Sequence, residues 1–315
     1  MRFGLHTGQH QVRFADLVEL WRDAERWGFD ACYLFDHFVP LHSGVEGFLP
    51  EEADHPTGPC LEATTALAAL ARAVPRIGVG LMVASVGYRA PGLLAHAAAT
   101  VALAAGPGRM ELGIGAGWFE PSYRAAGLPM PPPAERFDEL ERALQALASW
   151  LRGESASIPG IAEQAPPPPF QPAPRVWIAG TGERRLLPLA ARHADSWNAM
   201  YLTPVGFKDK VDALSERCES IGRNPSTLER SIALRAFCSE NGAAAFGSLA
   251  AWAAARSRDP ERLRARSLVG TPEDCRRQLE RYAEAGATHL AVMAHPPYDR
   301  EGLALLAGEV FPAFR

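Results

Sequence analysis

Residues 109–120 have the sequence RMELGIGAGWFE, a short apolar run that breaks into glycines and ends on two aromatic residues. The run 110–114 has the length and composition of a buried strand. Glycines at 113, 115 and 117 expose bare backbone where the strand ends, so a flat or phosphorylated group can approach without meeting a Cβ atom. Trp118 adds a rigid aromatic face. The same residues also suit a tight strand-to-helix turn with a packed tryptophan, so the rest of the chain must decide between the two.

Strand patterns alternate with helical patterns on both sides of this stretch. Eight strands are predicted, at 2–6, 30–35, 76–83, 109–114, 176–179, 196–200, 231–237 and 289–294. Helices are predicted at 14–27, 61–73, 91–104, 134–150, 183–193, 204–221, 243–256, 272–285 and 300–311. Such alternation indicates a parallel sheet, and eight units predict a closed (β/α)8 TIM barrel. A doubly wound sheet is the alternative, but it usually stops at about five or six strands.

Length and composition agree with one large α/β domain. The chain has 315 residues, 47% of them hydrophobic and 22% charged, which is typical of a globular protein with a sizeable core. Since α/β barrels routinely reach about 250 residues or more as one domain, we expect a single domain over 1–315. Within it, the segment 153–174 contains APPPPFQPAP and is expected to be an extended excursion without regular structure.

Several classes of protein are disfavoured. The formal net charge is −4 and no Lys/Arg block is present, so no nucleic-acid partner is expected. The apolar stretch 93–105 is too short for a membrane span, and the N-terminus lacks a signal core, so a cytoplasmic protein without a membrane partner is expected. Five scattered cysteines without a CxxC pair favour a reducing compartment over a disulfide framework or zinc ribbon.

The active site of such a barrel lies at the carboxyl ends of its strands. The residues expected there are His6; Asp36 and His37; Ala84 and Ser85; Gly115, Gly117 and Trp118; Gly180, Thr181 and Gly182; Trp197 and Asn198; and His295. Although scattered in sequence, they would ring one mouth. One histidine per strand end is a weak ligand set, so no metal is expected. Neither a dinucleotide fingerprint nor a Gly-x-Ser-x-Gly elbow is present.

Gly180-Thr181-Gly182, directly before a predicted helix, is a candidate anion site. Its N–H groups and the positive end of the helix dipole would lie beside a hydroxyl. A plain strand-to-helix turn explains the same residues equally well. Arg184 and Arg185 follow and would add positive charge, although a solvated helix face accounts for them too.

Several segments together resemble the bacterial luciferase-like monooxygenase superfamily, particularly its branch that uses the deazaflavin coenzyme F420. The matching segments are LFDHF (34–38), RIGVGLMV (76–83) followed by Arg89-Ala90-Pro91, GRMELGIGAGW (108–118), VWIAGTGERRLLPLAARHADSWN (176–198) and VGTPEDCRRQLERYAEAGATHLAVM (269–293). They occur in the family's order and cover nearly the whole chain.

The resemblance implies a luciferase-like barrel with an isoalloxazine-type ring at its mouth. A bulge with a non-proline cis peptide would back the ring near Met82-Val83, with Ala84 beside it. Gly180, Thr181 and Gly182 would take the cofactor phosphate. Asp36, Gly115, Gly117 and Trp197 complete the expected cofactor contacts. Members of the family are often dimers, so a homodimer is expected.

The resemblance also suggests catalytic residues and limits the substrate. His37 is predicted to act as a general acid/base or to hydrogen-bond the ring, with Asp36 beside it, and Trp118 is predicted to wall the substrate side. His6 and Glu120 are further candidates. The family's sugar-phosphate dehydrogenases carry a proton-donating glutamate where this chain has Trp118, and a tryptophan where it has Leu41. Their substrate is therefore not expected here.

The predicted function is hydride transfer between coenzyme F420 and a small organic substrate. An FMN-dependent monooxygenase of the same superfamily is the alternative, and a barrel that binds a flavin without catalysis is a second. A phosphosugar lyase on this fold would usually want a Schiff-base lysine at a strand end. The only lysines, Lys208 and Lys210, fall on a predicted surface helix.

Overall fold

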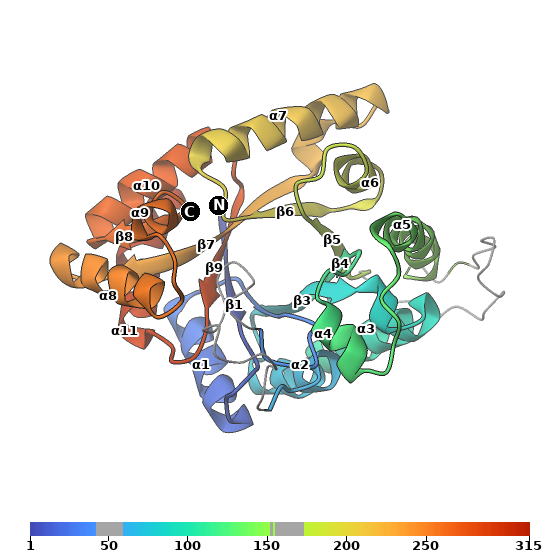
Figure 1. Ribbon diagram of the computed structural model, residues 1–315, viewed down its shortest axis with the longest axis horizontal. Coiled ribbons are helices and arrows are strands. Elements are labelled where there is room, and N and C mark those ends of the chain that lie inside the picture. Colours follow the sequence, from blue (N-terminus) through green and yellow to red (C-terminus); the bar gives the residue numbers. More distant parts are fainter. Residues whose placement is uncertain (42–58, 152–153, 155–172) are drawn as a thin grey trace.

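The computed structural model describes residues 1–41, 59–151, 154 and 173–315, and eight of its strands form a closed parallel barrel (Figure 1). In ring order the strands are β1 (Arg2–Thr7), β2 (Ala31–Leu34), β3 (Gly78–Ser85), β4 (Met110–Gly115), β5 (Arg175–Ala179), β6 (Ser196–Met200), β7 (Glu229–Cys238) and β9 (His289–Ala294). Pairing of β9 with β1, from Arg2 opposite His289 to Thr7 opposite Ala294, closes the ring. The predicted (β/α)8 barrel is confirmed. Most of the proline-rich excursion lies outside the described residues.

Helices surround the strands. They are α1 (Phe14–Trp27), α2 (Ala63–Ala73), α3 (Pro91–Ala105), α5 (Pro133–Trp150), α6 (Leu186–His193), α7 (Pro204–Ser220), α8 (Gly242–Ala254), α10 (Pro272–Glu284) and α11 (Arg300–Leu305). In α1, for example, Leu17, Leu20 and Trp21 are buried against the barrel, and Gly28 ends the helix in the left-handed conformation at φ +91°. The described helices include none that is long and apolar enough to cross a membrane.

Besides short 3₁₀ turns, two α-helices and one strand were not predicted: α4 (Glu120–Ala125), α9 (Pro260–Arg264) and β8 (Ser267–Gly270). Strand β7 explains the last of them. Its first half pairs with β9 up to Arg235, whereas its second half pairs with β8 from Arg235 onwards. Strand β8 therefore lies outside the ring, paired with the extension of β7. Arg235 is the residue of β7 at which the pairing changes from β9 to β8.

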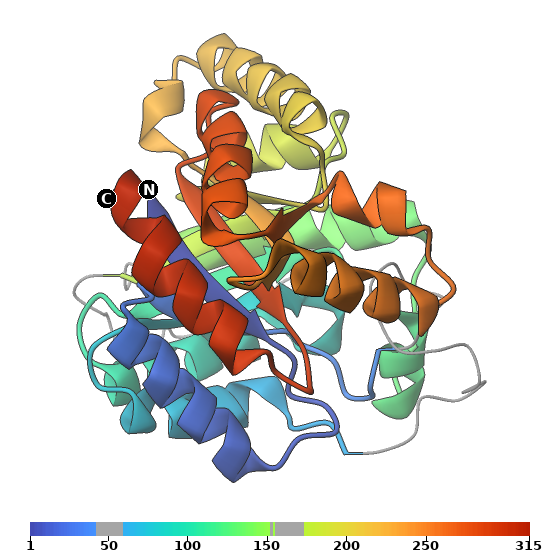
Figure 2. The ribbon, with the colours of Figure 1, turned by 90° about the vertical axis from the view of Figure 1, so that its left-hand side faces the viewer.

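The predicted last helix, 300–311, is also divided. Helix α11 ends at Leu305 and is followed by a π-helical turn (Leu306–Val310) and a 3₁₀ turn (Phe311–Phe314). Figure 2 shows this segment beside α1, with both ends of the chain close together. The Met1 ammonium donates a hydrogen bond to the Phe314 carbonyl at 2.6 Å, which joins the two ends.

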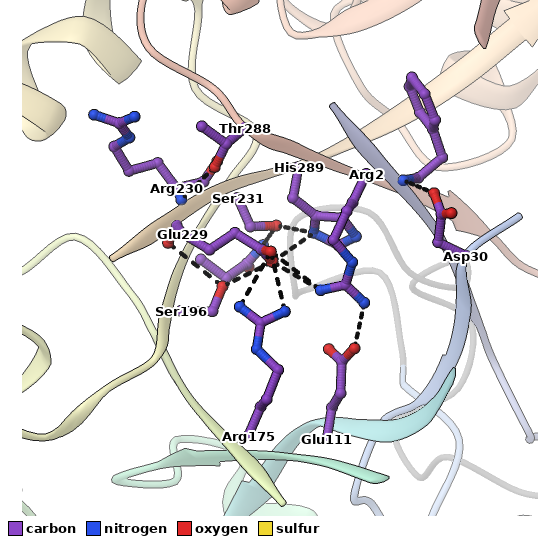
Figure 3. Close-up of polar contacts among 12 residues, drawn as sticks. Arg2, Asp30, Glu111, Arg175, Ser196, Glu229, Arg230, Ser231, Thr288 and His289 are labelled. Carbon is purple, nitrogen blue, oxygen red and sulfur yellow. Dashed lines mark hydrogen bonds and ion pairs between the residues drawn. The ribbon is translucent and has the colours of Figure 1, made fainter. Parts of the chain in front are cut away.

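Charged side chains close the amino end of the barrel, and we call Arg2, Glu111, Arg175, Glu229 and His289 the barrel floor (Figure 3). Glu229 accepts hydrogen bonds from Arg2 and Arg175, each at 3.1 Å, and Arg2 also pairs with Glu111. Burial opposes ionisation of Glu229, but the guanidinium groups of Arg2 and Arg175 hold its pKa below the ordinary value. Burial lowers the pKa of His289 to about 3, so its ring is neutral. The floor is thus a paired cluster of charged groups, in which His289 Nε2 has no hydrogen-bond partner among the described residues.

Candidate active site

A cleft of about 460 Å³ opens at the carboxyl ends of the strands, within the usual size range of small-molecule sites. It is lined from seven strand ends: His6 from β1; Phe35, Asp36 and His37 after β2; Met82–Ser85 from β3; Gly115–Trp118 from and after β4; Ala179–Thr181 at the end of β5; Met200 and Tyr201 at the end of β6; and Met293 from β9. Leu41, Tyr88, Phe137 and Leu186 complete it.

Most residues predicted for the site do line this cleft. These are His6, Asp36, His37, Met82, Val83, Ala84, Gly115, Gly117, Trp118, Gly180 and Thr181. Glu120, Gly182 and Trp197 do not. Lys208 and Lys210 lie on α7 in ion pairs with Asp212 and Glu183, away from the cleft, which agrees with the sequence-based argument against a lysine-dependent lyase.

Glu120 is the first residue of α4, and its side chain is mostly exposed, 3.5 Å from Arg124. It therefore faces solvent. Trp197 is fully buried behind the turn 180–182 that follows β5, which we call the β5 turn. Its indole N–H donates a hydrogen bond to the Gly180 carbonyl at 2.7 Å. Trp197 thus supports the turn from behind. His295, which the sequence placed at the mouth, does not line the cleft and lies beside His6, with 6.2 Å between the ring centroids.

The back of the cleft is a bulge in β3. The Met82-Val83 peptide is cis, and the pairing of β3 with β4 shifts between Leu81 and Ala84. This is the place that the family resemblance predicted for the cis peptide. His6 fixes the bulge, because its Nε2 lies 3.1 Å from the Met82 carbonyl oxygen.

The glycines of the 109–120 stretch serve this bulge. A Cβ atom on Gly113 would overlap the Leu81 carbonyl and the Val83 side chain, and one on Gly115 would crowd Val83. Gly117 has φ +76°, and a Cβ there would meet Tyr123 and Ser85. The prediction that they leave room for a cofactor is therefore incomplete: they first make room for the protein's own β3.

Asp36 is held by a buried arginine. Its carboxylate is fully buried and accepts hydrogen bonds from Arg89 at 2.6 and 3.0 Å. The Ser85 backbone N–H adds a third at 3.3 Å. Burial raises the pKa of Asp36, and Arg89 opposes that rise. Because Arg89 also pairs with Glu62, which caps α2 through Thr64 and Thr65, Asp36 is a positioning group tied to the helix layer.

His37 faces the cleft as a neutral ring. Its Nδ1 lies 3.3 Å from Ser122 Oγ and 3.5 Å from Tyr88 Oη. Burial lowers its pKa to about 3. Either hydroxyl can donate to or accept from Nδ1, so both neutral tautomers are available. Among the described residues Nε2 has no hydrogen-bond partner, and it is therefore the nitrogen available to a ligand.

Aromatic rings form the mouth beside His37. Trp118 is half exposed and contacts the His37 ring edge-on, with 5.6 Å between centroids. Phe119 is buried behind it, 5.1 Å from both rings. The exposed face of Trp118 is therefore a surface on which an apolar or planar group can pack.

The β5 turn offers two backbone donors. Gly180, at φ +130°, gives its N–H to the Asn198 carbonyl, so that donor is used within the barrel. The N–H groups of Thr181 and Gly182 have no partner among the described residues. They precede α6, where the positive end of the helix favours an anion.

Sequence reasoning missed several residues of the site. Arg89, Glu62 and Ser122 hold Asp36 and His37 but stand 27 to 85 positions away in sequence from their partners. The sequence did contain a signal for Arg89, because the Arg-Ala-Pro motif at 89–91 is one of the segments that carry the family resemblance. Tyr201 directly follows β6 and lies one residue beyond the predicted strand, which ends at Met200.

The fold and the cleft define a (β/α)8-barrel protein with a ligand site at the carboxyl ends of its strands. The chain belongs to the luciferase-like monooxygenase family, whose model matches residues 1–254.

Individual relatives span the whole chain. An F420-dependent glucose-6-phosphate dehydrogenase from Amycolatopsis mediterranei is 24% identical and aligns over 100% of this chain and 99% of its own. The structure of an F420-dependent secondary alcohol dehydrogenase with an F420–acetone adduct superposes with a TM-score of 0.82 at 20% identity, covering 100% and 99%. A monooxygenase from Streptomyces bottropensis has a TM-score of 0.79 at 17% identity, covering 100% of both chains.

Proposed function

We propose that the protein is an oxidoreductase that transfers a hydride between coenzyme F420 and a small organic substrate. The observation that carries the proposal is the cleft itself, with a bulged strand at its back, two free backbone donors at one side and a neutral histidine at the other. The full-length similarity to F420-dependent dehydrogenases supports the deazaflavin over FMN.

The residues present fit such a cofactor. The bulged Met82–Ala84 backbone would lie against the ring, with Gly115 and Gly117 at its edge. Thr181 and Gly182 would bind the phosphate through their N–H groups. When bound, the cofactor supplies the hydride donor or acceptor, whereas the protein orients the reactants and excludes water.

His37 is the proposed acid/base residue. A ring with a pKa of about 3 is neutral at physiological pH, so it is not an imidazolium acid, and in the tautomer with the proton on Nδ1 its Nε2 is the acceptor that faces a ligand. We therefore assign it as the base that takes the hydroxyl proton when an alcohol is oxidised, with Ser122 and Tyr88 fixing the ring. Such help contributes about 10²- to 10⁴-fold. Asp36 orients the loop after β2, and Trp118 lines the substrate side of the cleft. Glu120, which faces solvent, takes no part in the proposed reaction.

Binding spectra test the cofactor assignment. Purified protein is titrated with F420 and, separately, with FMN, and we expect binding of the deazaflavin. Tight FMN binding without deazaflavin affinity would refute the proposal and favour the monooxygenase alternative. Cofactor binding without turnover of any alcohol, aldehyde, ketone or imine would favour the non-catalytic barrel.

A matched pair of histidine variants tests His37. His37→Gln should lose at least about 100-fold in kcat while F420 still binds. His96→Gln, at an exposed position of α3, should leave both unchanged. Full activity in His37→Gln would exclude the assigned role.

We also propose a cytoplasmic homodimer without nucleic-acid or membrane partners. Leu93 and Leu103 of α3 are 59% and 69% exposed, and large apolar side chains on a helix face suit a subunit contact. Light scattering on the purified protein measures the mass. Leu103→Asp should dissociate the dimer, and a monomeric wild type would contradict this proposal.

A further inference from the structure

Much of the cleft is lined by apolar side chains. Leu41 follows β2, Phe137 belongs to α5, Leu186 begins α6 and Met200 ends β6, and all four line the cleft. We call these four residues the apolar wall. Because they come from four different elements, apolar surface lies on several sides of the cleft. A molecule bound there would therefore have apolar contacts on more than one side.

Two of the polar side chains in the cleft are engaged by protein partners. Asp36 is bound by Arg89, and Ser85 Oγ lies 3.2 Å from Tyr123 Oη. His37 Nε2, in contrast, has no hydrogen-bond partner among the described residues. An oxygen atom of a ligand can therefore hydrogen-bond at His37 while the apolar wall contacts the rest of the molecule.

The described residues that line the cleft include no arginine and no lysine. Two arginines adjoin the apolar wall in sequence but bind elsewhere. Arg136 donates a hydrogen bond to the Gly117 carbonyl, and Arg185 forms an ion pair with Asp138. An anionic group of a substrate would therefore meet no arginine or lysine among the described lining residues.

The histidines of the cleft carry no charge either. Burial lowers the pKa of His6 to about 4 and that of His37 to about 3, so both rings are neutral at physiological pH. The sequence of segment 42–58, which follows Leu41, contains four carboxylates and neither arginine nor lysine. Burial of a carboxylate or phosphate without a counter-charge is strongly disfavoured, whereas an uncharged apolar group gains by leaving water.

Apolar surface continues from the cleft to the solvent. Trp118 is 50% exposed and Met200 is 37% exposed, although both line the cleft. They lie at the carboxyl ends of β4 and β6, the two strands that flank β5. Large apolar side chains that stay open at a mouth are typical of a surface that a ligand covers. The body of a substrate can therefore extend outwards without losing apolar contact.

We propose that the substrate is an uncharged alcohol with an apolar body of several carbon atoms, or the corresponding carbonyl compound in the reverse direction. The hydroxyl donates to His37 Nε2, and the body packs on the apolar wall. On oxidation the carbinol carbon gives a hydride to oxidised F420 and the hydroxyl gives its proton to His37, which leaves a ketone or aldehyde and the reduced cofactor. The reaction rests on the proposed hydride transfer, whereas the preference for an uncharged ligand does not.

A matched pair of substrates tests the preference for an uncharged molecule. In 2-hydroxy-4-methylpentanoate, a carboxylate replaces the methyl group beside the carbinol carbon of 4-methyl-2-pentanol. The assay follows the loss of oxidised F420 by its absorbance. We expect kcat/KM to be at least about 100-fold higher for the alcohol, and a ratio below about tenfold would overturn the proposal. The uncharged methyl ester of the acid controls for the electronic effect of the carbonyl group and should react as the alcohol does.

A series of 2-alkanols tests the apolar wall. From 2-propanol to 2-hexanol, kcat/KM should rise about fourfold for each methylene group. Met200→Thr should lower the preference for 2-hexanol over 2-propanol by at least about fourfold. Val205→Thr, at an exposed position of α7 that does not line the cleft, is the matched control and should keep the wild-type preference. A kcat/KM that does not depend on chain length, or an equal loss in the control, would overturn the proposal.

Ligand binding separates this proposal from the proposed function. Saturation-transfer NMR detects 4-methyl-2-pentanone and 4-methyl-2-oxopentanoate on the protein without any reaction. We expect transfer to the ketone and none to the oxo acid, with weaker transfer in Met200→Thr. If the ketone binds but no alcohol is oxidised, the proposed hydride transfer is refuted and the preference for an uncharged ligand stands. Preferential binding of the oxo acid would overturn the preference and leave the hydride transfer standing.

Discussion

Removing Arg89 should expose how strongly the cleft depends on one buried ion pair. In Arg89→Met, the Asp36 carboxylate loses two hydrogen bonds of 2.6 and 3.0 Å while remaining fully buried. Loss of one partner of a buried pair costs about 3–5 kcal/mol. For a chain of this length, at about 2 °C per kcal/mol, the thermal midpoint should fall by about 6–10 °C. Differential scanning calorimetry measures that shift.

A double variant separates the charge from the shape. Asp36→Asn together with Arg89→Met removes both charges, so it should regain most of the lost stability. The pH dependence adds a second check. Without Arg89, the pKa of Asp36 rises further above 3.8 in the folded state, so the unfolded chain releases that proton first and the deficit grows as the pH rises above about 4. A deficit below about 1 kcal/mol, or no recovery in the double variant, would refute the reasoning.

Three further predictions concern other parts of the molecule. Acid should destabilise the protein, because four buried histidines have lowered pKa values and are neutral in the fold. These are His6 and His10, with pKa values of about 4, and His37 and His289, with values of about 3. Below about pH 6.5 each takes up a proton on unfolding, which costs up to about 1.4 kcal/mol per pH unit, and urea titrations should show this slope, reduced in His289→Gln. Glu229→Ala should lose about 3–5 kcal/mol by the same measurement, and the surface control Glu273→Ala less than about 1 kcal/mol. Trp118→Ala should raise KM about tenfold, with F420 affinity and thermal midpoint retained; an unchanged KM would exclude Trp118 from the substrate wall.

The barrel was predictable because its signal is repeated along the chain. Each strand is an apolar run, and each intervening helix carries its own periodicity, so errors at single boundaries do not change the topology. The ring of strand-end residues follows from that topology alone. Strand β8 was not predicted because its four residues, SLVG at 267–270, are too few to show a periodic pattern.

Side-chain pairing was not predictable from the sequence. Asp36 and Arg89 are 53 positions apart, and the pairing of β2 with β3 places them together. Glu120 illustrates the opposite error. It lies two residues beyond Trp118, and the unpredicted helix α4, which starts at Glu120, turns it towards solvent. The prediction from Gly113, Gly115 and Gly117 was incomplete for a similar reason. A sequence shows where a side chain is lacking but not which part of the protein occupies the space.

The barrel floor also bears on how this protein can be re-engineered. Its residues belong to β1, β4, β5, β7 and β9 and close the end of the barrel opposite to the cleft, and none of them lines the cleft. Stability and selectivity are therefore encoded at opposite poles of the same strands. A mutant library confined to the strand-end loops, with these five residues kept constant, should explore new specificities while retaining the scaffold.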